Sequence, residues 1–290
     1  MTNRRTIAAS TARAEALAYL AETFQLIGIE EPRREARKGL CAAIGVSEVA
    51  LIVASREPLE SGARRVQQLA MRRAAGEPMS RIVGEREFWS LSLEISPHVF
   101  DPRPESESII DAAISILSDR RDNASRILDL GVGSGALLCA LLTEFANARG
   151  VGVDISANAA NMARGNVDAC GHSHRVEIRV GDWTQGLAGP FDLIVANPPY
   201  IPTVDLPRLP REVRDFDPWL ALDGGFDGLA AFRRIIPEAR SLLAPGGWLI
   251  AEFGQAQAAG VIAITKLYDF ANTITYQDLA GRERVVAVRL

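Results

Sequence analysis

The sequence has few of the residues that build disulfide frameworks or metal centres. Its 290 residues include three cysteines and three histidines. Cys41, Cys139 and Cys170 lie far apart, and an odd number of scattered cysteines is typical of reduced thiols in a cytoplasmic protein. Cys170 begins a Cys-Gly-His-Ser-His segment, but no second cluster of ligands accompanies it, so no metal site is expected.

Lysine is scarce and long apolar runs are missing. Arginine supplies almost all of the positive charge, since lysine occurs only at Lys38 and Lys266, and the formal net charge is -4. This balance provides no large basic field for nucleic acid. No apolar run approaches the roughly 18 residues of a membrane helix, and Arg4-Arg5 is not followed by the apolar core of a signal peptide. We therefore expect a cytoplasmic protein without a membrane partner or direct contact with nucleic acid.

The N-terminal part of the chain has helical periodicity and no chemical motif. Apolar residues recur at helical spacing from about Thr11 to Ala75, with breaks at Gly28 and Gly62. We interpret residues 1–79 as a small helical domain, and we expect it to dock a substrate because nothing in it suggests chemistry.

A hairpin and a proline-rich link are expected over residues 80–107. Residues 82–83, 88–89 and 91–95 have the composition of short strands. The prolines that follow Asp101 force an extended backbone, and the acidic residues after them suit the first turn of a helix.

Strand and helix patterns alternate over residues 108–290. Strands are predicted at 126–130, 151–154, 176–180, 191–196, 248–253, 273–276 and 284–289, and helices at 136–145 and 157–169. A further helical segment at 229–243 contains Pro237, which is expected to break or kink it. This alternation predicts an α/β fold with a mostly parallel, doubly wound sheet.

A glycine-rich loop joins the first of these strands to its helix. It contains Gly131, Val132, Gly133, Ser134 and Gly135. Glycines permit a tight turn and let a ligand approach the backbone. The spacing also fits a relaxed dinucleotide fingerprint, so the loop alone does not separate a nicotinamide cofactor from S-adenosylmethionine.

Two more sequence features are expected beside this loop. Asp154 ends the second strand about twenty residues further on, where an acid can bind ribose hydroxyls. Trp183 follows the third strand, where it either contacts an adenine or packs within an ordinary turn.

The fourth strand ends at Asn197-Pro198-Pro199-Tyr200. Neither proline has a backbone N–H, so the acceptor oxygens of Asn197 and Pro198 dominate this segment. We call residues 197–200 the lip. Such a lip suits a planar –NH2 group, which donates two hydrogen bonds, and Tyr200 offers it an aromatic face. A plain Pro-Pro turn is the alternative. With no compelling acid–base pair for hydride transfer, the lip favours methyl transfer to nitrogen.

Together these segments resemble the peptide-chain release factor glutamine N5-methyltransferases of the HemK type. The resemblance covers nearly the whole chain and is carried by Gly84–Trp89, Pro102–Glu105, Asp129–Gly135, Val153–Ser156, Phe191–Tyr200, Ala221–Gly225, Asp227–Leu229 and Glu252–Gln255. The chain departs from the family at Ser80-Arg81, Asp101 and Ser106, outside the lip.

The resemblance implies an S-adenosylmethionine-dependent methyltransferase domain with a Rossmann-like fold. It implies cofactor contacts at Gly131 through Gly135, Asp154, Trp183 and Asn197. The substrate glutamine would meet Asn197, Pro198, Pro199 and Tyr200, with Asn197, Pro198 and Tyr200 acting in catalysis.

The implied substrate is the glutamine of the Gly-Gly-Gln loop in class 1 release factors, so the protein would modulate translation termination. Three alternatives remain: methylation of a ribosomal-protein glutamine, methylation of adenine or guanine in nucleic acid, and a non-catalytic S-adenosylmethionine-binding partner protein. The Asn-Pro-Pro-Tyr sequence by itself is shared with adenine and guanine methyltransferases, and the intact lip disfavours the non-catalytic alternative.

Overall fold

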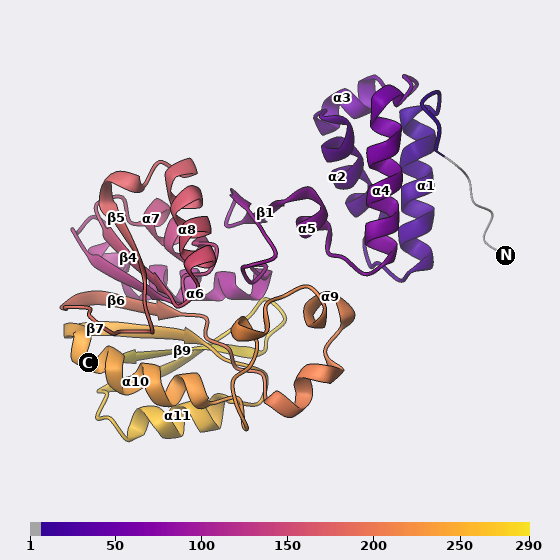
Figure 1. Ribbon diagram of the computed structural model, residues 1–290. Coiled ribbons are helices and arrows are strands. Elements are labelled where there is room, and N and C mark those ends of the chain that lie inside the picture. The colour runs from indigo at the N-terminus through magenta and orange to yellow at the C-terminus, as the bar shows by residue number, and fades with distance from the viewer. Residues whose placement is uncertain (1–6) are drawn as a thin grey trace. The chain divides into compact units, whose positions relative to one another are not determined.

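A computed structural model describes residues 7–290, so Arg4-Arg5 lies outside the described residues. The chain divides into two compact units, one ending at Gly84 and the other beginning at Glu85 (Figure 1). No helix among the described residues is both long and apolar enough to cross a membrane.

The first unit is helical. Its helices are α1 (Arg13–Leu26), α2 (Pro32–Ile44), α3 (Glu48–Val53), α4 (Ala63–Ala74) and α5 (Met79–Val83), with a 3-10 turn at Glu60–Gly62. Leu20, Phe24, Leu40 and Val66 are fully buried at its centre. The helical periodicity over residues 11–75 therefore marks the buried faces of these helices.

The strand expected at residues 82–83 is wrong, because this segment belongs to α5. Pro78 precedes the helix, and Gly84 ends it in a left-handed conformation with φ 81°. Met79 packs into the helical core, so burial within this unit overrides the short β-branched pattern. The predicted hairpin itself forms from β1 (Glu85–Phe88) and β2 (Leu91–Glu94).

The second unit contains a seven-stranded sheet with helices on both faces. The chain runs through a 3-10 turn (Pro104–Ser106), α6 (Glu107–Ile116), β3 (Arg126–Leu130), α7 (Ala136–Glu144), β4 (Arg149–Asp154), α8 (Ala157–Ala169), β5 (Val176–Val180), β6 (Phe191–Ala196), α9 (Arg211–Arg214), α10 (Ala230–Leu242), β7 (Leu243–Glu252), α11 (Ala258–Lys266), β8 (Asn272–Gln277) and β9 (Glu283–Arg289). Helices α6, α7 and α8 cover one face, while α10 and α11 cover the other (Figure 1).

The strand order is β5-β4-β3-β6-β7-β9-β8. The five neighbouring strands β5, β4, β3, β6 and β7 are parallel to one another. Strand β9 pairs antiparallel with β7, and β8 pairs antiparallel with β9 at the edge of the sheet. This confirms the predicted mostly parallel, doubly wound fold. The chain first builds outward from β3 through β4 to β5 and then continues at β6 on the other side, so the topological switch lies between β3 and β6, where such folds bind ligands.

Helix α10 runs through Pro237 without a break, so of the two predicted outcomes, a break or a kink, the break is wrong. Proline removes one backbone hydrogen bond, but Ile235, Ile236 and Ala239 are buried against the sheet. This packing holds the helix together across the missing bond.

Strand β7 begins at Leu243, earlier than the predicted start at Trp248. Phe191 pairs with Leu243, whereas Leu193 pairs with Trp248, so the register shifts between these pairs. Gly246, with φ 75°, lies in the extra segment. Gly246 and Gly247 therefore form an irregularity inside the strand.

Candidate active site

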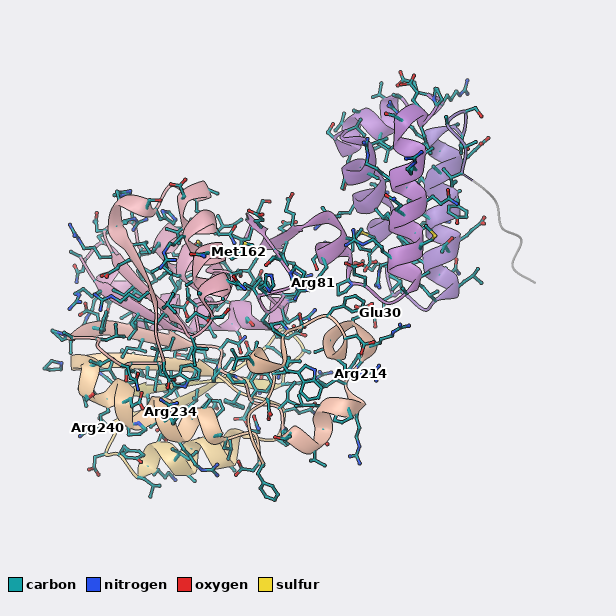
Figure 2. All side chains as sticks on the ribbon, in the orientation of Figure 1. Glu30, Arg81, Met162, Arg214, Arg234 and Arg240 are labelled. Carbon is teal, nitrogen blue, oxygen red and sulfur yellow. The ribbon has the colours of Figure 1, made fainter. Side chains whose placement is uncertain are left out.

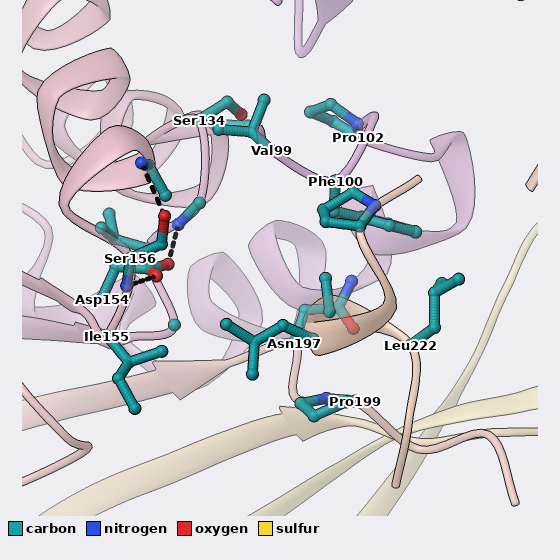
Figure 3. Close-up of a pocket in the computed structure, with 18 of the residues that line it drawn as sticks. Val99, Phe100, Pro102, Ser134, Asp154, Ile155, Ser156, Asn197, Pro199 and Leu222 are labelled. Atoms are coloured by element: carbon teal, nitrogen blue, oxygen red, sulfur yellow. Dashed lines mark hydrogen bonds between the residues drawn. The ribbon is translucent and has the colours of Figure 1, made fainter. Parts of the chain in front are cut away.

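The carboxyl ends of β3, β4, β5 and β6 meet at one edge of the sheet and open into a cavity of about 670 Å³. The glycine loop, Asp154, Trp183 and Asn197 follow these strands in turn. Asp154 and Ser156 lie on one side of the cavity, and Asn197 and Pro199 on another (Figure 3).

Most of the predicted site residues line this cavity: Gly131, Val132, Gly133, Ser134, Asp154, Trp183, Asn197, Pro199 and Tyr200. Gly135 and Pro198 are not among the lining residues. A side-chain carbon at Gly135 would lie 3.3 Å from Cα of Ala163, so this glycine allows α7 and α8 to pack closely. The ring of Pro198 is buried behind the rim.

The carboxylate of Asp154 organises the glycine loop. One of its oxygens accepts from the backbone N–H of Gly133 (2.9 Å) and the other from that of Ser156 (2.8 Å). Each carboxylate oxygen has a second lone pair, so Asp154 can still accept hydrogen bonds from a ligand hydroxyl. Burial raises the pKa of Asp154.

A second carboxylate lies beneath the loop. Asp129 is 1% exposed, and no side chain within residues 7–290 donates a hydrogen bond to either of its oxygens. Burial, together with the nearby charge of Asp154, raises the pKa of Asp129 to about 7. A cationic ligand in the cavity would favour the charged form of Asp129.

Trp183 covers the start of the glycine loop. A side-chain carbon at Gly131 would lie 3.5 Å from Cζ3 of Trp183, so the ring lies over the bare backbone of this glycine. Trp183 has a positive φ of 51°, which is uncommon for a large residue. The ring therefore forms a wall of the cavity.

Asn197 presents its two amide ends to different surroundings. Its Nδ2 donates to Oγ of Ser106 at 2.9 Å. Its Oδ1 has no hydrogen-bond partner among the described residues, and the side chain lines the cavity (Figure 3). An amide oxygen is thus available to accept from a bound group.

Tyr200 is fixed from behind. Its hydroxyl donates to Oε1 of Glu252 at 3.0 Å, and burial raises its pKa. A side-chain carbon at Gly224 would lie 2.8 Å from Cα of Tyr200, and one at Gly254 would lie 3.0 Å from its Cδ2. Two of the distant segments that carry the family resemblance therefore hold this tyrosine.

Sequence reasoning assigned no site role to several lining residues. Val99, Phe100, Pro102 and Arg103 come from the proline-rich link, and Leu209, Val213, Leu220 and Leu222 come from the segment after Tyr200. Arg234 of α10, labelled in Figure 2, also lines the cavity and pairs with Asp182 at 3.1 Å. Pro102, Arg103 and Leu222 lie in segments that carry the family resemblance, but no local pattern assigns them to the cavity, because tertiary packing brings them there.

Asp101, one of the departures from the family, is 1% exposed. Its carboxylate lies 3.5 Å from Arg86 and 3.6 Å from Arg103. Arg103 also pairs with the buried Asp217, which belongs to the segment after Tyr200. The departure is thus accommodated within a network of charges that ties two walls of the cavity together.

Comparison with known proteins identifies the family. The chain matches the family model described as Methyltransferase small domain over residues 98–206, and that described as PrmC N-terminal domain over residues 15–84. It is 44% identical to a release factor glutamine methyltransferase of Bradyrhizobium diazoefficiens, covering 93% of this chain and 92% of that protein. The chain belongs to the release factor glutamine methyltransferase family. A member from Rhodospirillum rubrum is 41% identical, over 92% of this chain and 81% of that protein.

Solved structures agree with a methyltransferase fold. The hMettl16 catalytic domain, in complex with MAT2A 3'UTR hairpin 6, has a TM-score of 0.57 at 14% identity, covering 78% of this chain and 81% of that one. The 16S rRNA N2 G1207 methyltransferase of T. thermophilus has a TM-score of 0.54 at 19% identity, covering 71% of this chain and 49% of that one. At such low identity these similarities concern the fold alone. Membership of the glutamine methyltransferase family confirms the resemblance seen in the sequence, and the protein is a methyltransferase.

Proposed function

We propose that this protein transfers a methyl group from S-adenosylmethionine to the side-chain nitrogen of the glutamine in the Gly-Gly-Gln loop of class 1 release factors. The observation that carries the proposal is the amide oxygen of Asn197, which faces the cavity without a partner among residues 7–290. The names of the relatives support the substrate class.

The cavity fits the cofactor. The uncrowded backbone at Gly133, the remaining lone pairs of Asp154 and the ring of Trp183 suit a nucleoside. The buried carboxylate of Asp129, to which no side chain among residues 7–290 donates a hydrogen bond, suits a positive charge nearby. When bound, S-adenosylmethionine supplies an electrophilic methyl group on a sulfonium sulfur.

The protein must make a poor nucleophile reactive. The lone pair of a glutamine amide nitrogen is delocalised into its carbonyl, so methylation requires the lone pair to point at the methyl carbon. In our proposal, Oδ1 of Asn197 and the carbonyl of Pro198 accept the two amide hydrogens. These bonds orient the nitrogen and favour the positive charge that develops on it.

Tyr200 and Pro199 shape the slot that receives the amide. Methyl transfer would form the new N–C bond and break the donor's C–S bond, which leaves S-adenosylhomocysteine as the product and makes the nitrogen cationic. A cationic amide nitrogen is acidic enough to lose its proton to water, so no strong general base is required before attack. This accounts for a lip without histidine, cysteine or glutamate.

The function is tested by offering tritiated-methyl S-adenosylmethionine with purified release factors, ribosomal proteins and nucleic acids side by side. We expect label on class 1 release factors alone. Label on a ribosomal protein or on adenine or guanine, with none on release factor, would replace the proposed substrate by that alternative.

Replacing Asp154 with alanine is expected to weaken S-adenosylmethionine binding by about tenfold to a hundredfold, because hydrogen bonds to a charged group are lost. The change also frees the N–H groups of Gly133 and Ser156, so part of the effect would come from the loop. Calorimetric titration with the cofactor and with an analogue lacking the ribose hydroxyls separates the two contributions.

If Asp154 binds the hydroxyls, removing them should weaken binding to the wild type much more than to the alanine variant. An equal penalty in both proteins would show that Asp154 acts through the loop. Unchanged affinity of a folded variant for the cofactor itself would contradict the assignment altogether.

We propose that the helical N-terminal domain docks the protein substrate. A protein of residues 85–290, which form a compact unit, should bind cofactor like the full chain but methylate intact release factor poorly. A short Gly-Gly-Gln peptide, which cannot reach a separate docking surface, should be methylated equally by both. Equal turnover of intact release factor by both proteins would contradict the docking role.

A further inference from the structure

A line of hydrogen bonds runs behind Asn197, on the side away from its unpaired oxygen. Nδ2 of Asn197 donates to Oγ of Ser106 (2.9 Å), and that hydroxyl donates to Oε2 of Glu252 (2.6 Å). Tyr200 donates to the other oxygen of the same carboxylate (3.0 Å). These hydrogen bonds therefore connect the side chains of Asn197 and Tyr200 to the buried carboxylate of Glu252.

The number of protons in this line determines how Asn197 is oriented. Both oxygens of Glu252 accept from hydroxyl groups, as an ionised carboxylate does, so the single hydroxyl proton of Ser106 points to Glu252. Oγ of Ser106 then has only lone pairs left for Asn197. The amide end that meets it must be the NH2 group, and the oxygen must point the other way.

This constraint matters because the two ends of an asparagine amide have nearly the same shape. If the amide turned over, its NH2 group would face the cavity and would repel the hydrogens of a substrate amide. The packing of Asn197 alone does not prevent such a rotation, whereas a hydroxyl that can only accept does.

Packing alone does not explain a glutamate at position 252. It is 2% exposed at the end of β7. Burial raises its pKa, while the bonds from Ser106 and Tyr200 and the charge of Arg284 favour its ionised form. A buried carboxylate is costly to desolvate, and an apolar residue would often serve stability as well.

We propose that Ser106 and Glu252 are positioning residues for methyl transfer, which fix the amide of Asn197 with its oxygen toward the substrate nitrogen. The inference rests on the proposed function, because this polarity matters only if the acceptor presents N–H groups at the lip. It assigns a role to Ser106, where the family often has threonine, a residue that keeps the hydroxyl.

A double-mutant cycle tests the inference. Ser106→Ala should lower kcat about tenfold, the upper range for one neutral hydrogen bond, with cofactor affinity unchanged by calorimetry. Ser106→Thr should restore kcat to within about twofold, because it retains the same donor and acceptor. In an Asn197→Ala background, Ser106→Ala should cause no further loss, since the group that it orients is gone.

Glu252→Gln is a second route to the same test. Its amide can donate to Ser106, so the hydroxyl is no longer forced to accept from Asn197. We expect a reduced kcat in the wild-type background and no further reduction in the Asn197→Ala background. Thermal unfolding of each variant identifies any that do not fold, and either Ser106 or Glu252 suffices to complete a cycle.

The same fold-loss in both backgrounds would overturn the inference, because it would show that the residue acts independently of Asn197. A folded Ser106→Thr variant as slow as Ser106→Ala would overturn it as well. These outcomes are distinct from failure of the proposed function, which would appear as wild-type protein that does not label release factor. The cycle would then be measured on whichever acceptor takes the label.

Discussion

Alanine at position 197 is expected to lower turnover on release factor by about two to three powers of ten, the usual cost of removing one group that stabilises developing charge. The amide oxygen of Asn197 is the one cavity-facing acceptor of the lip whose orientation is fixed by a known bond, from Nδ2 to Ser106. Its loss leaves the substrate nitrogen without a partner for one hydrogen and free to rotate away from the methyl carbon.

The fold should survive this change. Asn197 follows β6 and is only partly buried, so its removal leaves no large cavity in the core. Single-turnover kinetics at saturating cofactor measure the chemical step, and thermal unfolding measures stability. Asn272→Ala, an exposed position at the start of the far edge strand β8, is the matched control and should leave turnover unchanged.

A wild-type rate in the Asn197→Ala variant would remove the lip from the mechanism. A loss of stability as large as the loss of rate would instead point to a structural role. Affinity for the cofactor, measured by calorimetry, separates a defect in chemistry from a defect in binding.

The second large effect is expected in the substrate. Peptide mapping should find one additional methyl group on the glutamine of the Gly-Gly-Gln loop, since flanking glycines let the backbone come close to the rim of the cavity. A release factor with asparagine at this position should be methylated about a hundredfold more slowly, because its nitrogen would stop one methylene short of the lip.

The asparagine-bearing release factor should still dock. It should therefore inhibit methylation of the wild-type factor competitively, which separates failure to reach the lip from failure to bind. Methylation of the asparagine at the normal rate would show that the reaction does not depend on the length of the acceptor side chain. Methyl label at a different glutamine of the factor would refute the choice of acceptor.

Much of the α/β unit could be predicted because its signals are local. The strands at 126–130, 176–180 and 191–196 and the helix at 157–169 have the predicted bounds, since glycine, serine or proline flanks each of them on at least one side. The errors at residues 82–83 and at Pro237 arise where burial in the folded unit outweighs local preference.

The site was predictable to the same extent. Strand ends meet at one edge of a parallel sheet, so Gly131, Asp154, Trp183 and Asn197 were expected together, and they line one cavity. Ser106 and Glu252 were not assigned a role, because they lie 91 positions before and 55 positions after Asn197 and no spacing rule connects them. Their roles follow from hydrogen bonds that only the folded chain makes.

The close packing behind Tyr200 limits how this scaffold could be redirected to another acceptor. Gly224 packs against the backbone of Tyr200 and Gly254 against its ring, so the ring has little room to move back and admit a nucleobase. A wider slot would have to come from other side chains that line the cavity, such as Pro102 and Leu222 (Figure 3). An engineer seeking new acceptors should therefore randomise those two positions and leave the glycines untouched.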